Sequence, residues 1–248
     1  MTSVLSPRLA DRLFSIVLFL VGAGILSELI EAQALIVPKG KAFSNLFNLN
    51  AENTVPAWFS SVLLLTVAIY AYLIAQQDTA HTRKHRRLWL LLAVLFVVLS
   101  MDETVSVHEM IGGIVAKHGG EGTGLLRFAW VVPGLAFCVL VGGLFIPFVR
   151  DLAPGVRGQV LAAGLIYVSG ALGMEMIGGA VYSRSGHSPL YSALTVLEET
   201  LEMCGAVLCI RGFSGMLYEA APGLFAAPYA TAVLSARTAP DGIGSAAA

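Results

Sequence analysis

Six apolar stretches, each long enough to cross a membrane, constrain the fold of this 248-residue chain more than any other feature. A helix needs about 20 apolar residues to span the hydrocarbon core of a bilayer. We therefore expect an all-α integral membrane protein in which residues 1–216 form a six-transmembrane-helix bundle. Residues 217–248, rich in Ala, Gly and Pro, are expected to form a disordered, flexible cytoplasmic tail. The expected spans are 13–37, 56–76, 88–111, 128–149, 158–182 and 190–210.

The overall composition agrees with a multi-pass membrane protein. Hydrophobic residues make up 56% of the chain and charged residues only 12%. The formal net charge of −1 gives no reason to expect a nucleic-acid partner, and three cysteines within apolar stretches do not suggest a disulfide framework. The lipid bilayer is therefore the expected environment.

The distribution of basic residues predicts the orientation of the bundle. With the N-terminus inside, ten Lys and Arg residues face the cytoplasm and five face outward. Because cytoplasmic loops carry the excess of positive charge, both termini are expected inside, in a plasma membrane of bacterial inner-membrane type. The inward set is Arg8, Arg12, Arg83, Lys84, Arg86, Arg87, Arg150, Arg157, Arg211 and Arg237, and the outward set is Lys39, Lys41, Lys117, Arg127 and Arg184.

The first apolar stretch has a second interpretation. Arg8 and Arg12, the apolar run from Leu13 and the tripeptide at 32–34, Ala-Gln-Ala, together resemble a signal peptide with its cleavage site. The apolar run continues beyond that site, which favours an uncleaved helix. Cleavage would leave five helices without changing the rest of the topology.

Nine of the sixteen acidic residues lie within these apolar stretches, where there is no Lys or Arg. An Asp at the centre of a membrane helix costs roughly 2.5 to 3.5 kcal/mol on insertion scales, so nine such groups require a cation, shared protons or water. The sequence therefore predicts a polar site inside the membrane. The nine are Glu28, Glu31, Asp102, Glu103, Glu109, Glu175, Glu198, Glu199 and Glu202.

These acids are expected to converge in one layer. At about 1.5 Å per residue, counting from the cytoplasmic anchors places acids of the first, third and fifth helices in the outer half of the membrane, and those of the sixth helix between there and the midplane. At about 100° per residue, Asp102, Ser106 and Glu109 share a face of the third helix. Glu175 shares a face with small residues that permit close helix contact.

A repeated motif links two of these helices. The segment 109–115, Glu-Met-Ile-Gly-Gly-Ile-Val, matches 175–181, Glu-Met-Ile-Gly-Gly-Ala-Val, at all but one position. Glu28-Leu-Ile begins a much weaker echo in the first stretch. Because all three helices run in the same direction, the pattern favours three helical hairpins related by a parallel repeat. Chance similarity between apolar helices is the alternative.

The densest cluster of functional groups is the segment 100–109, Ser-Met-Asp-Glu-Thr-Val-Ser-Val-His-Glu. It contains His108, the single histidine within the six stretches, and imidazole combined with carboxylates suits iron, manganese or zinc. The string resembles sequences of uncharacterised bacterial membrane proteins, a resemblance that covers one helix and implies no activity. The Glu-x-x-His pairs of di-iron bundles are missing from the sequence.

Two functional classes follow, and they leave open whether the protein is an enzyme. The first is a divalent metal site for redox or hydrolytic chemistry on a lipophilic small molecule, with Asp102 and Glu103 as candidate catalytic groups. The second is a proton- or cation-coupled transporter or channel in which the acids form a relay, and a structural subunit of a membrane complex is a third interpretation. The candidate metal ligands are Glu28, Glu31, His108, Glu109, Glu175, Glu198, Glu199 and Glu202.

Overall fold

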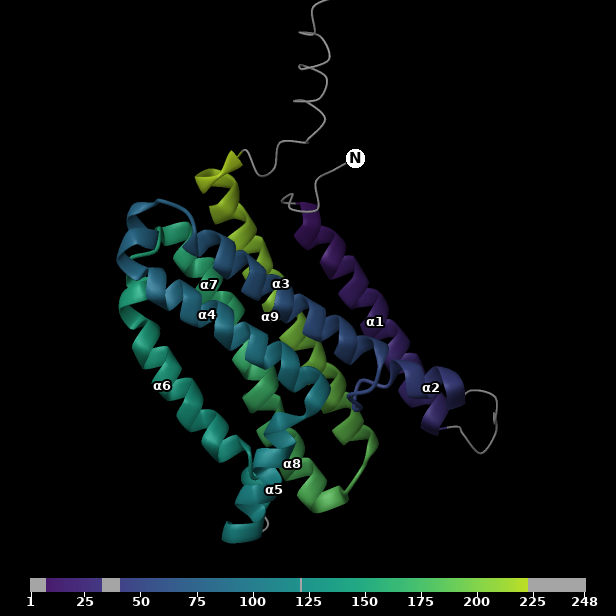
Figure 1. Ribbon diagram of the computed structural model, residues 1–248. Helices are drawn as coiled ribbons and strands as arrows, with labels where there is room; N and C mark the ends of the chain where they lie inside the picture. Colours follow the sequence, from purple (N-terminus) through teal and green to yellow (C-terminus); the bar gives the residue numbers. More distant parts are fainter. Residues whose placement is uncertain (1–7, 33–40, 121, 223–248) are drawn as a thin grey trace, which may run out of the picture.

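The computed structural model describes residues 8–32, 41–120 and 122–222, and within these ranges the chain is helical with no β-strand. The all-α prediction is thereby confirmed, and Figure 1 shows the long helices running side by side. The α-helices are α1 (Arg8–Ala32), α2 (Lys41–Phe47), α3 (Val55–Ala75), α4 (Ala80–Val105), α5 (Val107–Gly119), α6 (Val131–Arg150), α7 (Pro154–Val168), α8 (Glu175–Ser185) and α9 (Pro189–Ala220). A 3₁₀ turn, η2 (Gly124–Leu126), precedes α6, and a π-helical segment, η3 (Ser169–Met174), joins α7 to α8.

Three of the long helices begin at hydroxyl N-caps. Thr54 accepts a hydrogen bond from the Ala57 amide at the start of α3, and Thr79 accepts one from the Thr82 amide at the start of α4. Ser188 caps α9 in the same way, with a proline directly after it. A hydroxyl cap satisfies an amide that has no partner inside the helix, and proline at the first helical position has no amide to satisfy.

The core lies between α3 and α9. Leu64 and Val67 of α3 and Val207 and Ile210 of α9 are completely buried, and Trp89 of α4 packs with them. By contrast, large apolar side chains cover the outside of the bundle: Leu140 on α6 is 73% exposed and Leu165 on α7 is 71% exposed. Apolar patches of this extent are rare on soluble monomers, and here they provide the surface that contacts lipid.

Five helical segments of the described chain are long and apolar enough to cross a membrane, which identifies a multi-pass membrane protein. They are Leu9–Glu31, Val55–Ala75, Ala80–Val105, Val131–Arg150 and the continuous segment Pro154–Ser185. The sixth predicted span corresponds to α9, which does not belong to this set. Three glutamates and Arg211 interrupt the apolar sequence of α9.

The third predicted span, 88–111, is not one helix. Helix α4 ends at Val105. Ser106 takes a left-handed conformation with φ of 55°, and α5 starts in a new direction. The Asp102 carboxylate accepts a hydrogen bond from the His108 amide at 2.8 Å, which replaces the bond that a continuing helix would make. The expectation that Asp102, Ser106 and Glu109 share one helix face is therefore wrong.

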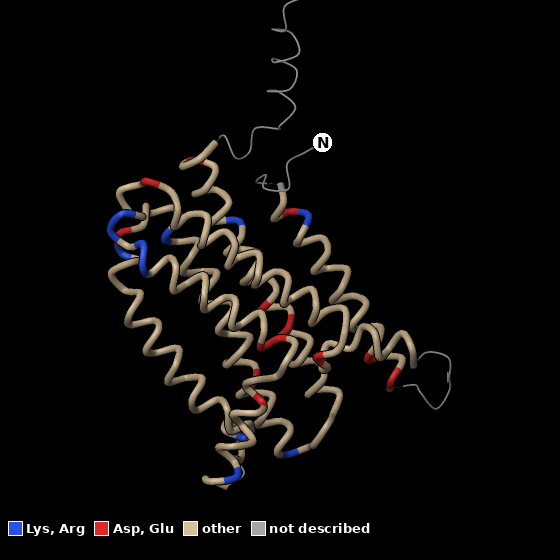
Figure 2. Tube along the Cα trace, viewed as in Figure 1, with Lys and Arg blue, Asp and Glu red and all other residues tan. Residues whose placement is uncertain are grey.

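The two described ends of the chain, the start of α1 and the end of α9, lie at the same end of the bundle (Figure 1). Figure 2 shows Lys and Arg gathered mainly at that end, whereas several acidic segments lie midway along the bundle. The remainder of the tripeptide at 32–34 and the predicted tail from residue 223 onward lie outside the described residues. Helix α9 itself continues to Ala220.

Candidate functional site

A cavity of about 860 Å³ runs through the middle of the bundle and contains most of the predicted acids. Helices α4, α5, α6, α7 and α9 contribute to its wall, together with η3, the start of α8 and the loop before α3. Its carboxyl groups are Glu52, Asp102, Glu103, Glu109, Glu175, Glu198, Glu199 and Glu202. The predicted convergence of acids from separate helices is therefore present. Glu28 and Glu31 of the predicted set do not line the cavity, whereas Glu52, which was not predicted, does.

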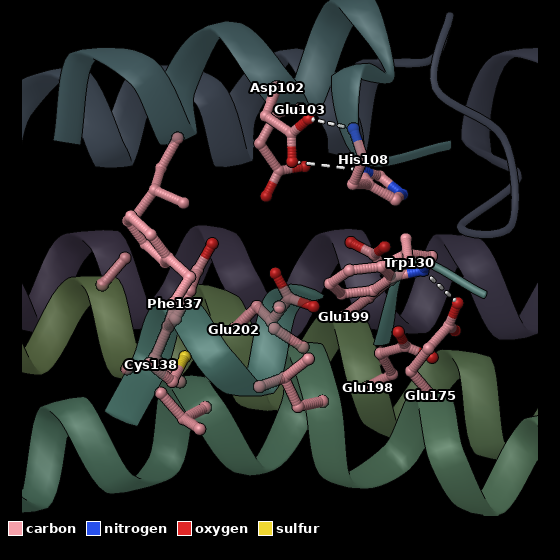
Figure 3. Close-up of a pocket in the computed structure, with 18 of the residues that line it drawn as sticks. Asp102, Glu103, His108, Trp130, Phe137, Cys138, Glu175, Glu198, Glu199 and Glu202 are labelled. Atoms are coloured by element: carbon pink, nitrogen blue, oxygen red, sulfur yellow. Dashed lines mark hydrogen bonds and ion pairs between the residues drawn. The ribbon is translucent and has the colours of Figure 1, made fainter. Parts of the chain in front are cut away.

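Asp102 and His108 form the best-defined pair in the site. One Asp102 oxygen accepts the His108 amide at 2.8 Å, and the other lies 3.0 Å from Nδ1 of the same histidine (Figure 3). With Nδ1–H donating to the carboxylate, the lone pair of His108 is on Nε2. This is the arrangement by which a carboxylate orients a metal-binding histidine and makes it more basic.

His108 lies in a group of three potential metal ligands. One ligand atom each from Glu52, His108 and Glu109 lies within 4.8 Å of the others. Glu109 is in the first turn of α5, where the helix N-terminus favours negative charge. Burial, and then the negative charge of Glu109, raise the pKa of Glu52, which lies in the loop outside the membrane-spanning helices. Carboxyl groups crowded in this way favour uptake of a proton or a cation.

Glu175 lies on the opposite wall and is linked to the histidine through Trp130. The Trp130 indole donates to Glu175 Oε1 at 2.9 Å, and its ring centroid lies 4.8 Å from that of His108. Glu198 of α9 lies beside Glu175 in the same view, so two carboxyl groups meet at this wall of the cavity (Figure 3).

Three further acids lie deeper along the cavity. Ser60 of α3 donates to Glu103 Oε1 at 2.9 Å, and Tyr167 of α7 lines the cavity together with Glu202. Glu199 faces the same space, and all three acids remain half-buried because they border the cavity rather than packed side chains. The second candidate catalytic residue, Glu103, thus lies between the ligand group around His108 and the part of the cavity that Glu199 and Glu202 line.

Glu28 and Glu31 do not reach this site. Helix α1 packs against α2 and α9, where Glu28 is half-buried and Glu31 is exposed, and neither lines the cavity. Gly24, one and two helical turns before these glutamates, lies against Leu49 in the segment after α2. Periodicity identifies a helix face without identifying its neighbour.

Three residues of the site were not among the sequence predictions. Glu52 lies in a loop and was not among the acids within apolar stretches, and Trp130 lies just before α6. Tyr167 offered a usable signal, because its hydroxyl group lies within an apolar helix and needs a partner there, as the acids do. Only the tertiary structure brings Glu52 and Trp130 next to His108.

A family model described as "Domain of unknown function (DUF8692)" matches residues 13–216, which include every cavity-lining acid. Neither a curated protein nor a solved structure matches the chain.

Proposed function

The chain belongs to the DUF8692 family, and we propose that it is a multi-pass plasma-membrane protein that binds a divalent metal ion for redox or hydrolytic chemistry on a lipophilic substrate. In this proposal α9 is a sixth span, tolerated in the bilayer because its glutamates face the cavity rather than lipid. An even number of spans then agrees with both described ends lying at one end of the bundle.

The observation that carries the proposal is the group formed by Glu52, His108 and Glu109, with Asp102 behind the histidine. One imidazole and two carboxylates suit iron, manganese or zinc. Three protein ligands leave positions open for water or substrate, as catalytic sites require. A bound ion would supply a Lewis acid or a redox centre.

The other acids of the cavity have complementary roles in this proposal. Asp102 fixes the orientation of His108 and is a positioning residue. Glu103, held by Ser60, faces the cavity and is the candidate proton acceptor. The other predicted ligands that line the cavity are proposed to hold a second ion or to store protons: Glu175, Glu198, Glu199 and Glu202.

A proton- or cation-conducting relay is the second candidate, and the spread of acids along the cavity favours it. Carboxyl groups extend from Glu109 through the Glu175–Glu198 pair to Glu202. In a relay these groups hold protons at rest, since burial and neighbouring negative charges favour the neutral form.

Metal analysis of protein purified without chelator tests the proposal. We expect stoichiometric metal in the wild type, loss of metal in Glu52→Gln and Glu109→Gln, and full occupancy in the control Glu31→Gln, whose side chain is exposed on α1. Chelation should lower the melting temperature and added ion should restore it, because the metal binds only the folded state. A metal-free protein indifferent to chelator, with proton flux in liposomes that Glu199→Gln abolishes, would establish the relay instead.

A further inference from the structure

The cavity has two chemically different arms. The carboxyl groups, His108 and Trp130 occupy one arm, whereas Phe137 and Cys138 of α6 lie at the other end of the view in Figure 3. Aliphatic and aromatic side chains form the wall of this second arm, which we call the apolar arm: Leu92, Phe96, Phe137, Val141, Phe145 and Val160. The metal chemistry proposed above uses none of these residues.

The wall of the apolar arm is incompletely closed on the side of α6. This helix packs only lightly against α4 and α7, and Phe137 lines the cavity while remaining 47% exposed. Gly142 on α6 and Gly164 on α7 also line it, and a Cβ atom added at either position would meet no atom within 4 Å. An alkyl chain therefore has room between these helices, next to the surface that contacts lipid.

The length of the arm sets the size of the occupant. Leu92 and Asp102 both line the cavity and are ten residues apart on α4, which corresponds to about 15 Å along the helix axis. A medium-length alkyl chain that entered between α6 and α7 would reach from the apolar end to the acids.

The charge of the other arm restricts the head group. Among the described residues, eight carboxyl groups line the cavity against one guanidinium, that of Arg127, which also lies over the Tyr182 ring. Even with a divalent ion bound and some acids protonated, a phosphate head would meet like charge, whereas an amine or hydroxyl head would donate hydrogen bonds to carboxylate oxygens.

We propose that the ligand of this cavity is a single-chain lipid with an amine or hydroxyl head group, its chain in the apolar arm and its head among the acids. This inference rests on the proposed function only for the reaction that follows binding. The shape and charge of the cavity carry the binding step independently.

Photolabelling in nanodiscs tests the inference, using dodecylamine with a diazirine at the end of its chain and the matching dodecyl phosphate. We expect the amine probe to label residues of α6 and α4 that line the apolar arm, with competition by unlabelled dodecylamine. Gly142→Leu and Gly164→Leu should each reduce this labelling several-fold by filling the arm from two different helices. Their controls are Gly143→Leu and Gly158→Leu, on the same two helices, where an added Cβ also meets nothing but the residue does not line the cavity.

The metal content of the same samples separates the two proposals. The lipid inference is overturned if the two probes label the protein equally, or if neither glycine variant changes the labelling. If metal is present in those samples, the metal site still stands. Selective labelling that both variants reduce, in protein without metal, supports the lipid inference and contradicts the metal function.

Discussion

Asp102 shows how one side chain can set both the local fold and the site. Its carboxylate accepts a hydrogen bond from the His108 amide, and this bond marks the end of α4. The same carboxylate pairs with Nδ1 of His108, so Nε2 points away from the aspartate. The sequence placed Asp102 and His108 in one functional cluster. The sequence did not reveal that the helix is interrupted between them. Helical periodicity assumes a continuous helix, whereas a hydrogen bond from the backbone to a side chain competes with the helix.

A second aspartate, in the connection between α6 and α7, makes the stability depend on pH. Hydrogen bonds from Lys84 and then from His85, each at 2.6 Å, lower the pKa of Asp151 to about 2. An unfolded Asp has a pKa of about 3.9, so the folded state favours the ionised form. This contribution to stability is present above pH about 4 and is lost as the pH falls toward 2.

We expect Asp151→Asn to melt at a lower temperature than the wild type near neutral pH, with a difference that disappears as the pH falls from about 4 to 2. Circular dichroism melts across this range measure it. Asp78→Asn, which removes a partner of Arg83 in an exposed ion pair, serves as the control and should change stability little. A difference between wild type and Asp151→Asn that persists at the acidic end would show that the aspartate acts without ionising.

At the scale of elements, close helix contacts at glycines bring the acids of α9 to the cavity. A Cβ atom at Gly170 of η3 would lie 2.8 Å from the Glu198 carbonyl and 2.9 Å from Glu202 Cγ. A Cβ at Gly205 of α9 would lie 2.8 Å from the Tyr167 amide nitrogen. These two glycines let α7, η3 and α9 approach where Tyr167 and Glu202 line the cavity. The sequence predicted small residues beside acids without specifying the partner helix.

We therefore expect Gly205→Ala to destabilise the bundle by about 1 to 3 kcal/mol, since the new methyl group would meet backbone that must move. Gly215→Ala, on the same helix with nothing within 4 Å of its Cβ, is the matched control. The control should be neutral or stabilising, because alanine favours a helix over glycine by up to about 1 kcal/mol. Thermal melts in detergent compare the two, and equal stability would contradict the tight contact.

For the whole molecule, hydropathy predicted the all-α class and the long apolar spans. Long apolar runs and hydroxyl caps are local properties, so the bounds of α3 follow closely from the sequence. Placement was harder to predict: Glu28 and Glu175 look alike within their own helices, yet only Glu175 faces the cavity. Which helix packs against α9 depends on the fit of all faces at once, and a search limited to apolar stretches could not include Glu52.

The orientation of the bundle remains a prediction that rests on ten inward and five outward basic residues. Reporter fusions after Gln77, Arg150 and the C-terminus should behave as cytoplasmic, and fusions after Asn50, Gly120 and Gly186 as external. The fusion at Gly186 and the one at the C-terminus lie on either side of α9, so they test directly whether this glutamate-bearing helix crosses the membrane. If both fusions report the same side, α9 does not cross the membrane. Its acids then need no shielding from lipid, and the carboxylate-lined cavity would have to face water.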